Sequence, residues 1–333
     1  MLDLSAVIAM SGTYFSAFFV TYLTIPQLAK WFNRQGIVGT DVHKLGKPKI
    51  PEMCGLSLLA GVMIASLLLS ILFREYSRQI IAFMGTVLFA AAVGAIDDIR
   101  PLNPKGKPIL TALAAAPILI LGVYDPHPIF PLIGPVRLTI VYPFLIPLAI
   151  TVPANAVNMF DVFNGAMTST LAIVTLAMAA VSMLSGNILT TSLALATSGS
   201  LLALHIFNRF PAQVFIGDAG SLAAGAAVGA LAVIGSIEAV AIVALAPYIM
   251  NAFYGLASLG RFYERRQIRS RPVRLRRDGL LEATEDMHAP ITLARLILAE
   301  GPMKEPRVVR LMIMMTTLSS LLALCAFFIM EIP

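Results

Sequence analysis

Acidic and amide side chains gather in three short segments, each at the end of a long apolar run. In chain order these residues are Asp97, Asp98, Asn155, Asn158, Asp161, Asn164 and Asp218. A polar group of this kind beside a membrane is costly enough to indicate function by default. Carboxylate and amide oxygens are ligands for hard cations such as Mg²⁺, which accompany phosphate groups in enzymes. The three segments therefore predict phosphate chemistry that a cation assists.

The first segment pairs Asp97 with Asp98 and is followed by Lys107. Adjacent carboxylates repel each other unless a cation compensates, and either Mg²⁺ or a basic neighbour can do so. Lys107 could be that neighbour, or it could bind a phosphate as a point charge. The alternative is that the two acids only end a helix in water, although a negative pair at a helix C-terminus opposes the helix dipole.

The second segment repeats polar residues every three positions, from Asn155 to Asn164, and ends at Gly165. On a helix these side chains would form one stripe, and the glycine would let the chain turn. Amides can ligate a metal or read the edge of a base, and Asp161 adds an acid. Hydrogen bonding between helices inside a bundle is the alternative.

The third segment, from Phe215 to Ser221, precedes a run rich in alanine and glycine. Its glycines permit close backbone approach, and the N-terminus of the following helix attracts anions. Asp218 could hold a metal at a bound phosphate, and Phe215 could stack on a nucleobase. Alternatively, Phe215 is an aromatic residue at the lipid interface, and the glycines serve helix packing.

These segments must be positioned by membrane helices. Of 333 residues, 58% are hydrophobic and only 13% are charged, whereas a soluble domain carries roughly a quarter charged residues. The apolar blocks are long enough to cross about 30 Å of hydrocarbon. We predict an all-α polytopic membrane protein with ten transmembrane helices. The expected spans are 5–29, 53–73, 79–97, 108–124, 139–157, 166–185, 188–206, 217–236, 238–260 and 308–330.

The distribution of Lys and Arg predicts the orientation. Loops after odd-numbered spans hold 21 of these residues and the other loops hold three, so the former are expected in the cytoplasm and both termini outside. All three polar segments then lie on the cytoplasmic face. The formal charge of +6 is explained by these loops, so we expect no nucleic-acid partner. The first span has no preceding basic region, which favours a retained helix over a cleaved signal.

Residues 261–307 form a basic loop within a single domain, 1–333. Much of its charge is explained by orientation and attraction to anionic membrane lipids, but some arginines could clamp a diphosphate. The stretch from His288 to Arg295 reads as a turn into an amphipathic surface helix, and His288 is a candidate base. The two cysteines are expected at opposite membrane faces, without a disulfide.

In combination, the three segments resemble the polyprenyl-phosphate N-acetylhexosamine-1-phosphate transferases, of the glycosyltransferase family 4 type. The resemblance runs from about residue 41 to 310. It implies ten transmembrane helices, a cytoplasmic active site and Mg²⁺, with Mn²⁺ as an alternative. It also implies transfer of a sugar phosphate from a UDP-sugar to a polyprenyl phosphate.

The resemblance also implies roles for individual residues. Asp218 and Asn158 would ligate the metal, Asp97 and Asp98 would lie near the acceptor phosphate, and Lys107 would contact phosphate. Phe215 would stack on uracil, Asn164 would contact it, and Asp161 would be an essential acid. Further substrate-binding residues are expected at Lys44, Glu52, Asn155, Gly165, Arg274, Arg276 and His288.

Two departures refine the resemblance. The bacterial enzymes carry a His-rich motif where this chain has only His288, and Ile50-Pro51-Glu52 is similar to the eukaryotic element. Both favour a dolichol-type enzyme that uses UDP-GlcNAc or a close relative in the first membrane step of lipid-linked glycan assembly. The absence of the eukaryotic enzyme's longer insertions, together with the stretch from Pro290 to Arg295, is similar to archaeal members.

Several alternatives stay open. The first is the same chemistry with another UDP-N-acetylhexosamine or lipid acceptor. The acceptor phosphate is expected to attack the β-phosphorus directly, with a covalent aspartyl phosphate as the competing route. A transporter, which would carry its acids near the bilayer midplane, is more distant. A homodimer is a further expectation that no named residue supports.

Overall fold

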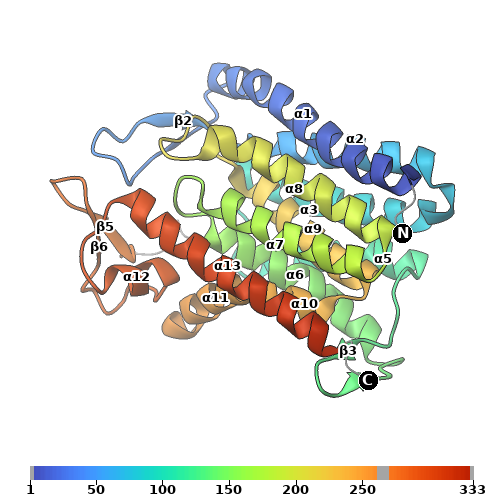
Figure 1. Ribbon diagram of the computed structural model, residues 1–333. Helices are drawn as coiled ribbons and strands as arrows, with labels where there is room; N and C mark the ends of the chain where they lie inside the picture. Colours follow the sequence, from blue (N-terminus) through green and yellow to red (C-terminus); the bar gives the residue numbers. More distant parts are fainter. Residues whose placement is uncertain (1–3, 261–269, 331–333) are drawn as a thin grey trace.

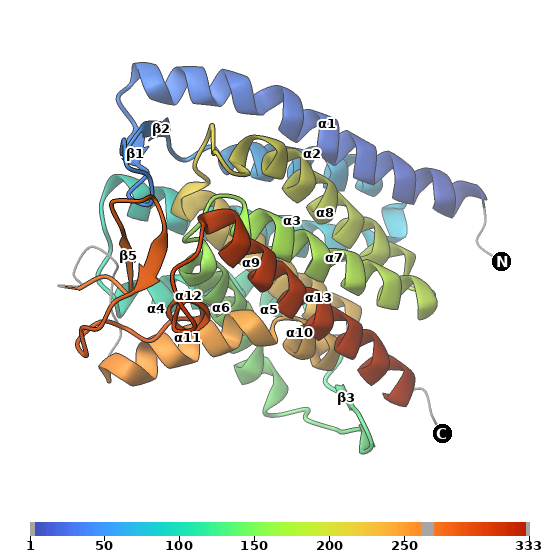
Figure 2. The same cartoon turned by 60° about the vertical axis from the view of Figure 1, so that its left-hand side comes forward.

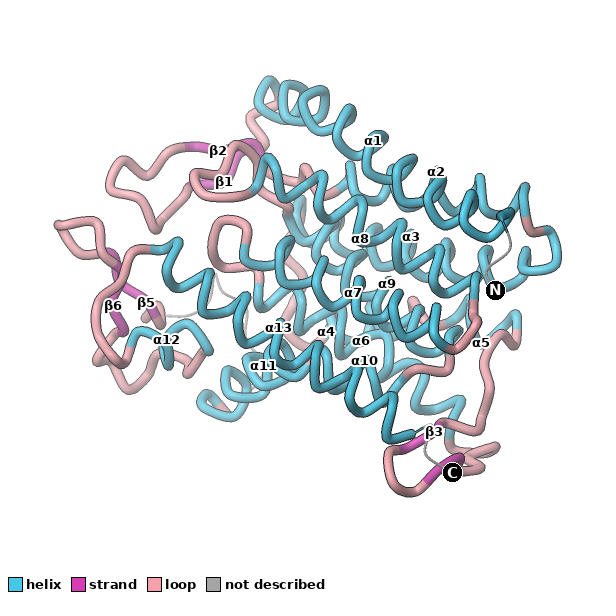
Figure 3. Tube along the Cα trace, in the orientation of Figure 1, coloured by secondary structure: helices cyan, strands magenta, loops and turns pink. Residues whose placement is uncertain are grey.

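The computed structural model describes residues 4–260 and 270–330. The predicted basic residues Arg261, Arg265, Arg266 and Arg269 lie outside the described residues. Helices dominate the described part, together with three short antiparallel hairpins, β1–β2, β3–β4 and β5–β6 (Figure 3). The all-α prediction is confirmed.

The helices are α1 (Leu4–Arg34), α2 (Leu56–Leu72), α3 (Ser77–Ile99), α4 (Gly106–Leu113), α5 (Ala116–Leu121), α6 (Tyr142–Phe160), α7 (Ala166–Leu184), α8 (Ile188–Asn208), α9 (Gly217–Gly235), α10 (Glu238–Ala244), α11 (Ala246–Leu259), α12 (Leu293–Leu298) and α13 (Glu305–Met330), with a 3₁₀ turn at Arg74–Tyr76. The strands are β1 (Val38–Thr40), β2 (Lys49–Pro51), β3 (Ile129–Phe130), β4 (Gly134–Pro135), β5 (Val273–Leu275) and β6 (Leu281–Ala283).

Helix α9 forms the centre of the bundle, packed between α3 and α6. Its residues Gly225 and Gly229 lie directly against the backbone of Pro153, Ala154 and Ala149 on α6. Small side chains let two helices approach this closely, which is how membrane helices gain packing energy without a hydrophobic drive. The Ala- and Gly-rich run therefore serves packing along its length, and only its first turn reaches the polar segments.

The β1–β2 and β5–β6 hairpins and α12 lie at one end of the bundle, which we call the hairpin end. The first turns of α1, the last turns of α13 and β3 lie at the opposite end, with β3 beside α13 (Figures 1 and 2). Because α6 and α3 both end at the hairpin end while α9 begins there, the three polar segments are brought to one face.

Within the described residues, seven helices are long and apolar enough to cross a membrane, or eight if α10 and α11, bent by 66° at their junction, form one broken span. The segments Leu56–Leu72 and Gly106–Leu121 are shorter apolar helices. The expected breaks near Gly186 and Ser236 are both present. Ten spans stays a prediction.

One expectation about the second polar segment is wrong. Helix α6 ends at Phe160, so Asp161 and Asn164 lie in the turn before α7 and share no helical stripe with Asn155 and Asn158. Gly165 starts α7 with a φ of +77°, a left-handed conformation that glycine adopts without steric cost. The turn that the glycine predicted is confirmed, but it begins four residues earlier.

Candidate active site

A cavity of about 870 Å³ opens at the hairpin end. Its walls come from the ends of α3 and α6, the start of α4 and α9, the β1–β2 loop, and the segment that precedes β5. Nine of the predicted site residues line it: Glu52, Asp97, Lys107, Asn155, Asn158, Asp161, Asn164, Phe215 and Asp218. Three chain segments far apart in sequence therefore share one cavity.

Lys107 is at the polar centre of this cavity. Its Nζ lies 2.7 Å from Asp97 Oδ2, 2.7 Å from Asp218 Oδ2 and 3.2 Å from Asn158 Oδ1. The side chains of Lys107 and Asp97 are both only 4% exposed, so their ion pair is little screened by water. The lysine thereby joins one polar group from each of the three segments.

Asn158 and Asp218 are also bonded directly to each other. Asn158 Nδ2 donates to Asp218 Oδ1 at 2.7 Å and to Ser221 Oγ at 2.9 Å. These bonds orient the amide so that its oxygen faces Lys107. Ser221, one turn after Asp218 on α9, was not singled out as a site residue by the sequence.

Asp97 and Asp98 are adjacent but have different partners. Asp97 faces the cavity and accepts a hydrogen bond from Leu102 N at 2.5 Å. Asp98 instead accepts from the backbone nitrogens of Asp218 and Ala219, at 2.8 and 2.9 Å. A carboxylate at a helix N-terminus satisfies otherwise unpaired N–H groups and complements the dipole. Asp98 therefore holds the start of α9, and through it the position of Asp218.

Asn155 lines the cavity and is hydrogen-bonded to two neighbouring threonines. Its Nδ2 donates to Thr111 Oγ1 at 2.8 Å and to Thr151 O at 2.9 Å. Thr111 lies one turn after Lys107 on α4 and also donates to the Lys107 carbonyl. Asn155 thus supports the helix that carries the lysine.

Phe215 lines the cavity beside the β1–β2 hairpin. Its backbone nitrogen donates to Pro51 O at 2.8 Å, and its carbonyl accepts from Cys54 N at 3.0 Å. Gly39 of β1 lies so close to the ring that a Cβ there would be 2.8 Å from Cδ2. Glu52 and Asp161 line the same cavity.

Lys44 lies outside the cavity lining. It is bonded to Glu305 and lies 3.3 Å from Asp41 Oδ2. Gly165 donates its backbone N–H to Asn208 Oδ1 at 3.1 Å. Both residues adjoin Asn164, whose own contacts include Asp41 and Glu305.

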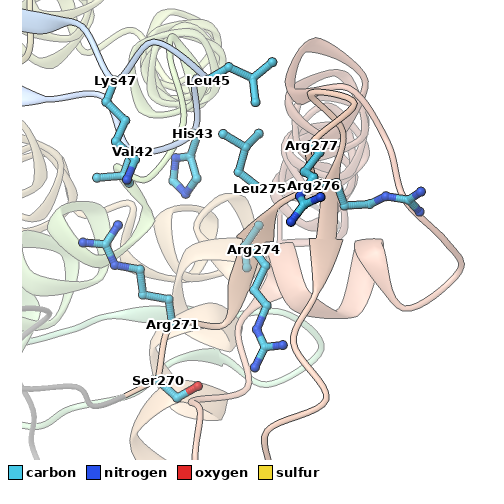
Figure 4. A pocket seen from close by; sticks show the side chains of 11 residues that line it. Val42, His43, Leu45, Lys47, Ser270, Arg271, Arg274, Leu275, Arg276 and Arg277 are labelled. Atoms are coloured by element: carbon cyan, nitrogen blue, oxygen red, sulfur yellow. The ribbon is translucent and has the colours of Figure 1, made fainter.

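Arg274 and Arg276 line a second cavity, of about 610 Å³, between the β1–β2 loop and the β5–β6 hairpin. Figure 4 shows their guanidinium groups pointing in different directions, and Arg276 pairs with Asp278 at 3.1 Å. Arg271 lines both cavities. Among the described arginines, Arg271 is therefore the one at the border of the main cavity, which the sequence did not single out.

His288 is exposed and lines neither cavity. It belongs to the predicted turn, where its backbone N–H bonds to Asp286 Oδ1 at 2.9 Å and holds the pKa of that carboxyl below its usual range. The short helix α12 follows, with its apolar face buried. The structure does not bring His288 together with the other predicted site residues.

Comparisons with known proteins agree that the three polar segments belong to one site. Residues 80–236 match the sequence profile of glycosyl transferase family 4. A protein of Saccharolobus solfataricus, named as a candidate UDP-N-acetylglucosamine–dolichyl-phosphate N-acetylglucosaminephosphotransferase, is 30% identical over 71% of this chain and 74% of its own. A candidate glycosyltransferase of Methanocaldococcus jannaschii is 32% identical over 81% of both chains. This chain belongs to glycosyl transferase family 4.

The family also includes bacterial relatives. The phospho-N-acetylmuramoyl-pentapeptide-transferase of Streptococcus pneumoniae serotype 19F is 31% identical over 64% of this chain and 70% of its own. The apolar helices and this membership make the chain an integral membrane protein. The family match, residues 80–236, covers all three polar segments and ends with α9.

The donor set of this family 4 chain fits a hard cation. Three oxygens, from Asp97, Asp218 and Asn158, converge on the Lys107 ammonium, so the geometry already stabilises positive charge at this point. Mg²⁺ is typically held in proteins by one or two carboxylates together with water and substrate phosphates. Among the described residues no group of three His, Cys, Asp or Glu side chains could hold a metal ion.

Proposed function

We propose that this protein transfers N-acetylglucosamine-1-phosphate from UDP-GlcNAc to a polyprenyl phosphate of the dolichyl type and releases UMP. The observation that carries the proposal is a single cavity in which the polar group formed by Lys107, Asp97, Asn158 and Asp218 lies beside an apolar wall. The name of the Saccharolobus relative, which specifies UDP-GlcNAc and dolichyl phosphate, supports this choice of donor and acceptor.

The apolar wall suits the acceptor lipid. It consists of Leu148 and Val152 of α6 with Ala252 and Leu256 of α11. Leu148 and Val152 are 55% and 43% exposed, so this side of the cavity is continuous with the surface that faces lipid. The acceptor chain would lie along α6 and α11 and place its phosphate near Lys107.

The nucleotide would occupy the opposite side of the cavity. Phe215 offers an aromatic face, Asn164 a polar group, and Arg271 a positive charge for the diphosphate. We assign the hairpin end to the cytoplasm, because the Lys and Arg bias favours that side. A water-soluble donor and a lipid acceptor can meet at such a face.

In the reaction, an acceptor phosphate oxygen attacks the β-phosphorus of UDP-GlcNAc. A new P–O bond forms there, the bond from the β-phosphorus to the bridging oxygen breaks, and UMP leaves with that oxygen. A lipid phosphate is already largely ionised near pH 7, so positioning and charge neutralisation matter more than a general base. Lys107 is placed to hold the acceptor phosphate beside the donor.

Mg²⁺, held by Asp218 and Asn158 with Asp97 nearby, would neutralise the donor diphosphate and stabilise UMP as it leaves. Asp98 keeps Asp218 in place by capping α9, and any residual acceptor proton would pass to Asp97, which faces the cavity. Direct attack needs no covalent aspartyl intermediate.

The test is an assay of the purified protein in detergent with UDP-GlcNAc and dolichyl phosphate, with and without MgCl₂. We expect Mg²⁺-dependent UMP release and a lipid-linked GlcNAc phosphate in the wild type. Asp218→Ala should lose at least about a hundredfold in rate. Asp125→Ala, an exposed acid at the far end of the bundle, is the matched control and should retain wild-type activity.

Other outcomes change the proposal in defined ways. Turnover with UDP-N-acetylmuramoyl-pentapeptide instead of UDP-GlcNAc would assign the chain to the activity named for the Streptococcus relative. Absence of turnover with every UDP-sugar, in folded protein, would refute the transferase proposal.

A further inference from the structure

Two buried acids and a lysine surround Asn164 without lining the polar centre. Lys44 Nζ bonds to Glu305 Oε2 and lies 3.3 Å from Asp41 Oδ2. Asp41 and Glu305 are each 4% exposed, and Lys44 lies 4.4 Å above the centre of the Phe210 ring. We call Asp41, Lys44 and Glu305 the acid–lysine clamp.

The clamp connects parts of the chain that are distant in sequence. Asp41 and Lys44 belong to the β1–β2 loop, Glu305 is the first residue of α13, and Asn164 is in the turn between α6 and α7. Two carboxylates and one ammonium leave a buried negative charge, which is costly unless hydrogen bonds compensate. Asn164 supplies two of these bonds, one from its backbone and one from its side chain.

These bonds fix the direction of the Asn164 amide. Its backbone N–H donates to Glu305 Oε1 at 2.8 Å, and its Nδ2 donates to Asp41 Oδ2 at 3.2 Å. Its Oδ1 accepts from the backbone nitrogen of Ala212 at 3.1 Å. A carboxylate only accepts and a backbone N–H only donates, so these partners exclude the flipped amide.

An amide nitrogen carries two N–H groups, and Asp41 takes one of them. Asn164 lines the main cavity, as Phe215 does. With its carbonyl bonded to Ala212 N, the side chain has a second N–H that it can donate to a ligand in the cavity.

The resemblance already implies that Asn164 contacts uracil; we propose that the acid–lysine clamp positions this residue, so that its amide nitrogen donates to the C4 carbonyl oxygen of the base, the group that uracil has and cytosine lacks. Glu305, Lys44 and Asp41 are then positioning residues that set base recognition through Asn164, with Asp41 at the cavity wall and the other two outside the cavity lining. This inference rests on the proposed function for the identity of the ligand, a uridine nucleotide.

The test measures UMP binding, which needs neither acceptor lipid nor turnover. UMP should raise the Tm of the wild-type protein, since a ligand that binds only the folded state stabilises it. Glu305→Ala should weaken the apparent affinity for UMP about tenfold, the effect of one lost hydrogen bond. It should also reduce the preference for UMP over CMP. Glu305→Gln keeps one acceptor oxygen, which can still accept the Asn164 N–H but leaves an amide NH₂ toward Lys44. It should therefore restore part of the affinity and of the preference.

A double-mutant cycle separates loss of Asn164 positioning from a general loss of stability. In an Asn164→Ala background, Glu305→Ala should weaken UMP binding no further, because coupled residues are non-additive. Equal effects of Glu305→Ala with and without Asn164 would overturn the inference. If Glu305→Ala does not fold, Asp41→Ala, which spares the Glu305–Lys44 pair, carries the same test.

Glu300→Ala, an exposed acid just after α12, is the control and should bind UMP as the wild type does. Wild-type UMP binding in Glu305→Ala and Asp41→Ala would refute the clamp while leaving the transferase proposal intact. UMP binding that depends on the clamp, in a protein without transferase activity, would refute the reaction but keep this inference. Failure of UMP to bind the wild-type protein would overturn the inference that the clamp sets base recognition.

Discussion

At the scale of single residues, the site depends on how its charges compensate one another. Lys107 lies between Asp97 and Asp218, and the amide of Asn158 completes the group. An ammonium between two carboxylates relieves a repulsion that burial would otherwise strengthen. In the proposed reaction, Asp97 and Asp218 would hold a cation that supplies positive charge at this point, and Lys107 would bind phosphate beside it.

Replacement of Lys107 tests this balance. Lys107→Met leaves two close carboxylates uncompensated, so we expect a loss of about 3 kcal/mol in stability, seen as a lower Tm in detergent, together with loss of transferase activity. MgCl₂ should raise the Tm of this variant more than that of the wild type, because Mg²⁺ then supplies the missing positive charge.

Lys105→Met is the matched control, since Lys105 is exposed and lies outside the cavity lining. It should change neither the Tm nor its response to MgCl₂. An equal response to Mg²⁺ in Lys107→Met and the wild type would count against a metal site at Asp97 and Asp218.

At the scale of elements, the site depends on the close crossing of α3 and α9. Gly94 of α3 lies against the start of α9, where a Cβ would be 2.3 Å from Asp218 O and 2.5 Å from Ala219 Cα. Four residues later on α3, Asp98 caps the same turn. The glycine allows the approach, and the carboxylate fixes it.

Gly94→Ala should therefore act on the site through α9. The added methyl group meets backbone, which cannot rotate away, so we expect about 1–3 kcal/mol of destabilisation. The shift of Asp218 should lower kcat by about a hundredfold. Thermal unfolding in detergent and the UMP-release assay measure the two effects.

Gly12→Ala on α1 provides the comparison, because nothing lies within 4 Å of a Cβ there. An alanine in that helix should be neutral or slightly stabilising. If both glycine variants behaved alike, the crossing at Gly94 would not be what positions Asp218.

At the scale of the whole molecule, the fold separates two ends. All three polar segments, the clamp and both cavities lie at the hairpin end, while α1 begins and α13 finishes at the other (Figures 1 and 2). The proposed cytoplasmic location of the hairpin end would place the turn between α7 and α8 on the external face.

Two single cysteines test this orientation in cells. An impermeant maleimide should label Ser185→Cys from outside, and it should label Glu300→Cys only in opened membranes. Both are built on Cys325→Ser. Cys54 can stay, because burial raises the pKa of its thiol to about 12 and keeps it protonated at pH 7.5. The reverse labelling pattern would place the hairpin end outside.

Much of the architecture followed from the sequence. The apolar helices follow from local composition, because a bilayer requires long apolar segments. The breaks near Gly186 and Ser236 and the positive φ of Gly165 do so too, because turns require special backbone conformations. The chemistry of Asp97, Asn158 and Asp218 was also recognisable from the sequence, since these acidic and amide residues lie at the ends of the third, fifth and eighth predicted spans that face the same side of the membrane.

Other features depended on tertiary structure. Sequence order makes Asp97 and Asp98 equivalent, but the rotation of α3 about its axis directs one to Lys107 and the other to the start of α9. Likewise, Asp41 and Glu305 are 264 residues apart and meet only because α13 packs beside α7 at the hairpin end. Local patterns in the sequence determine the elements and their chemistry, whereas helix rotation and long-range packing decide which side chains face the substrate and which hold others in place.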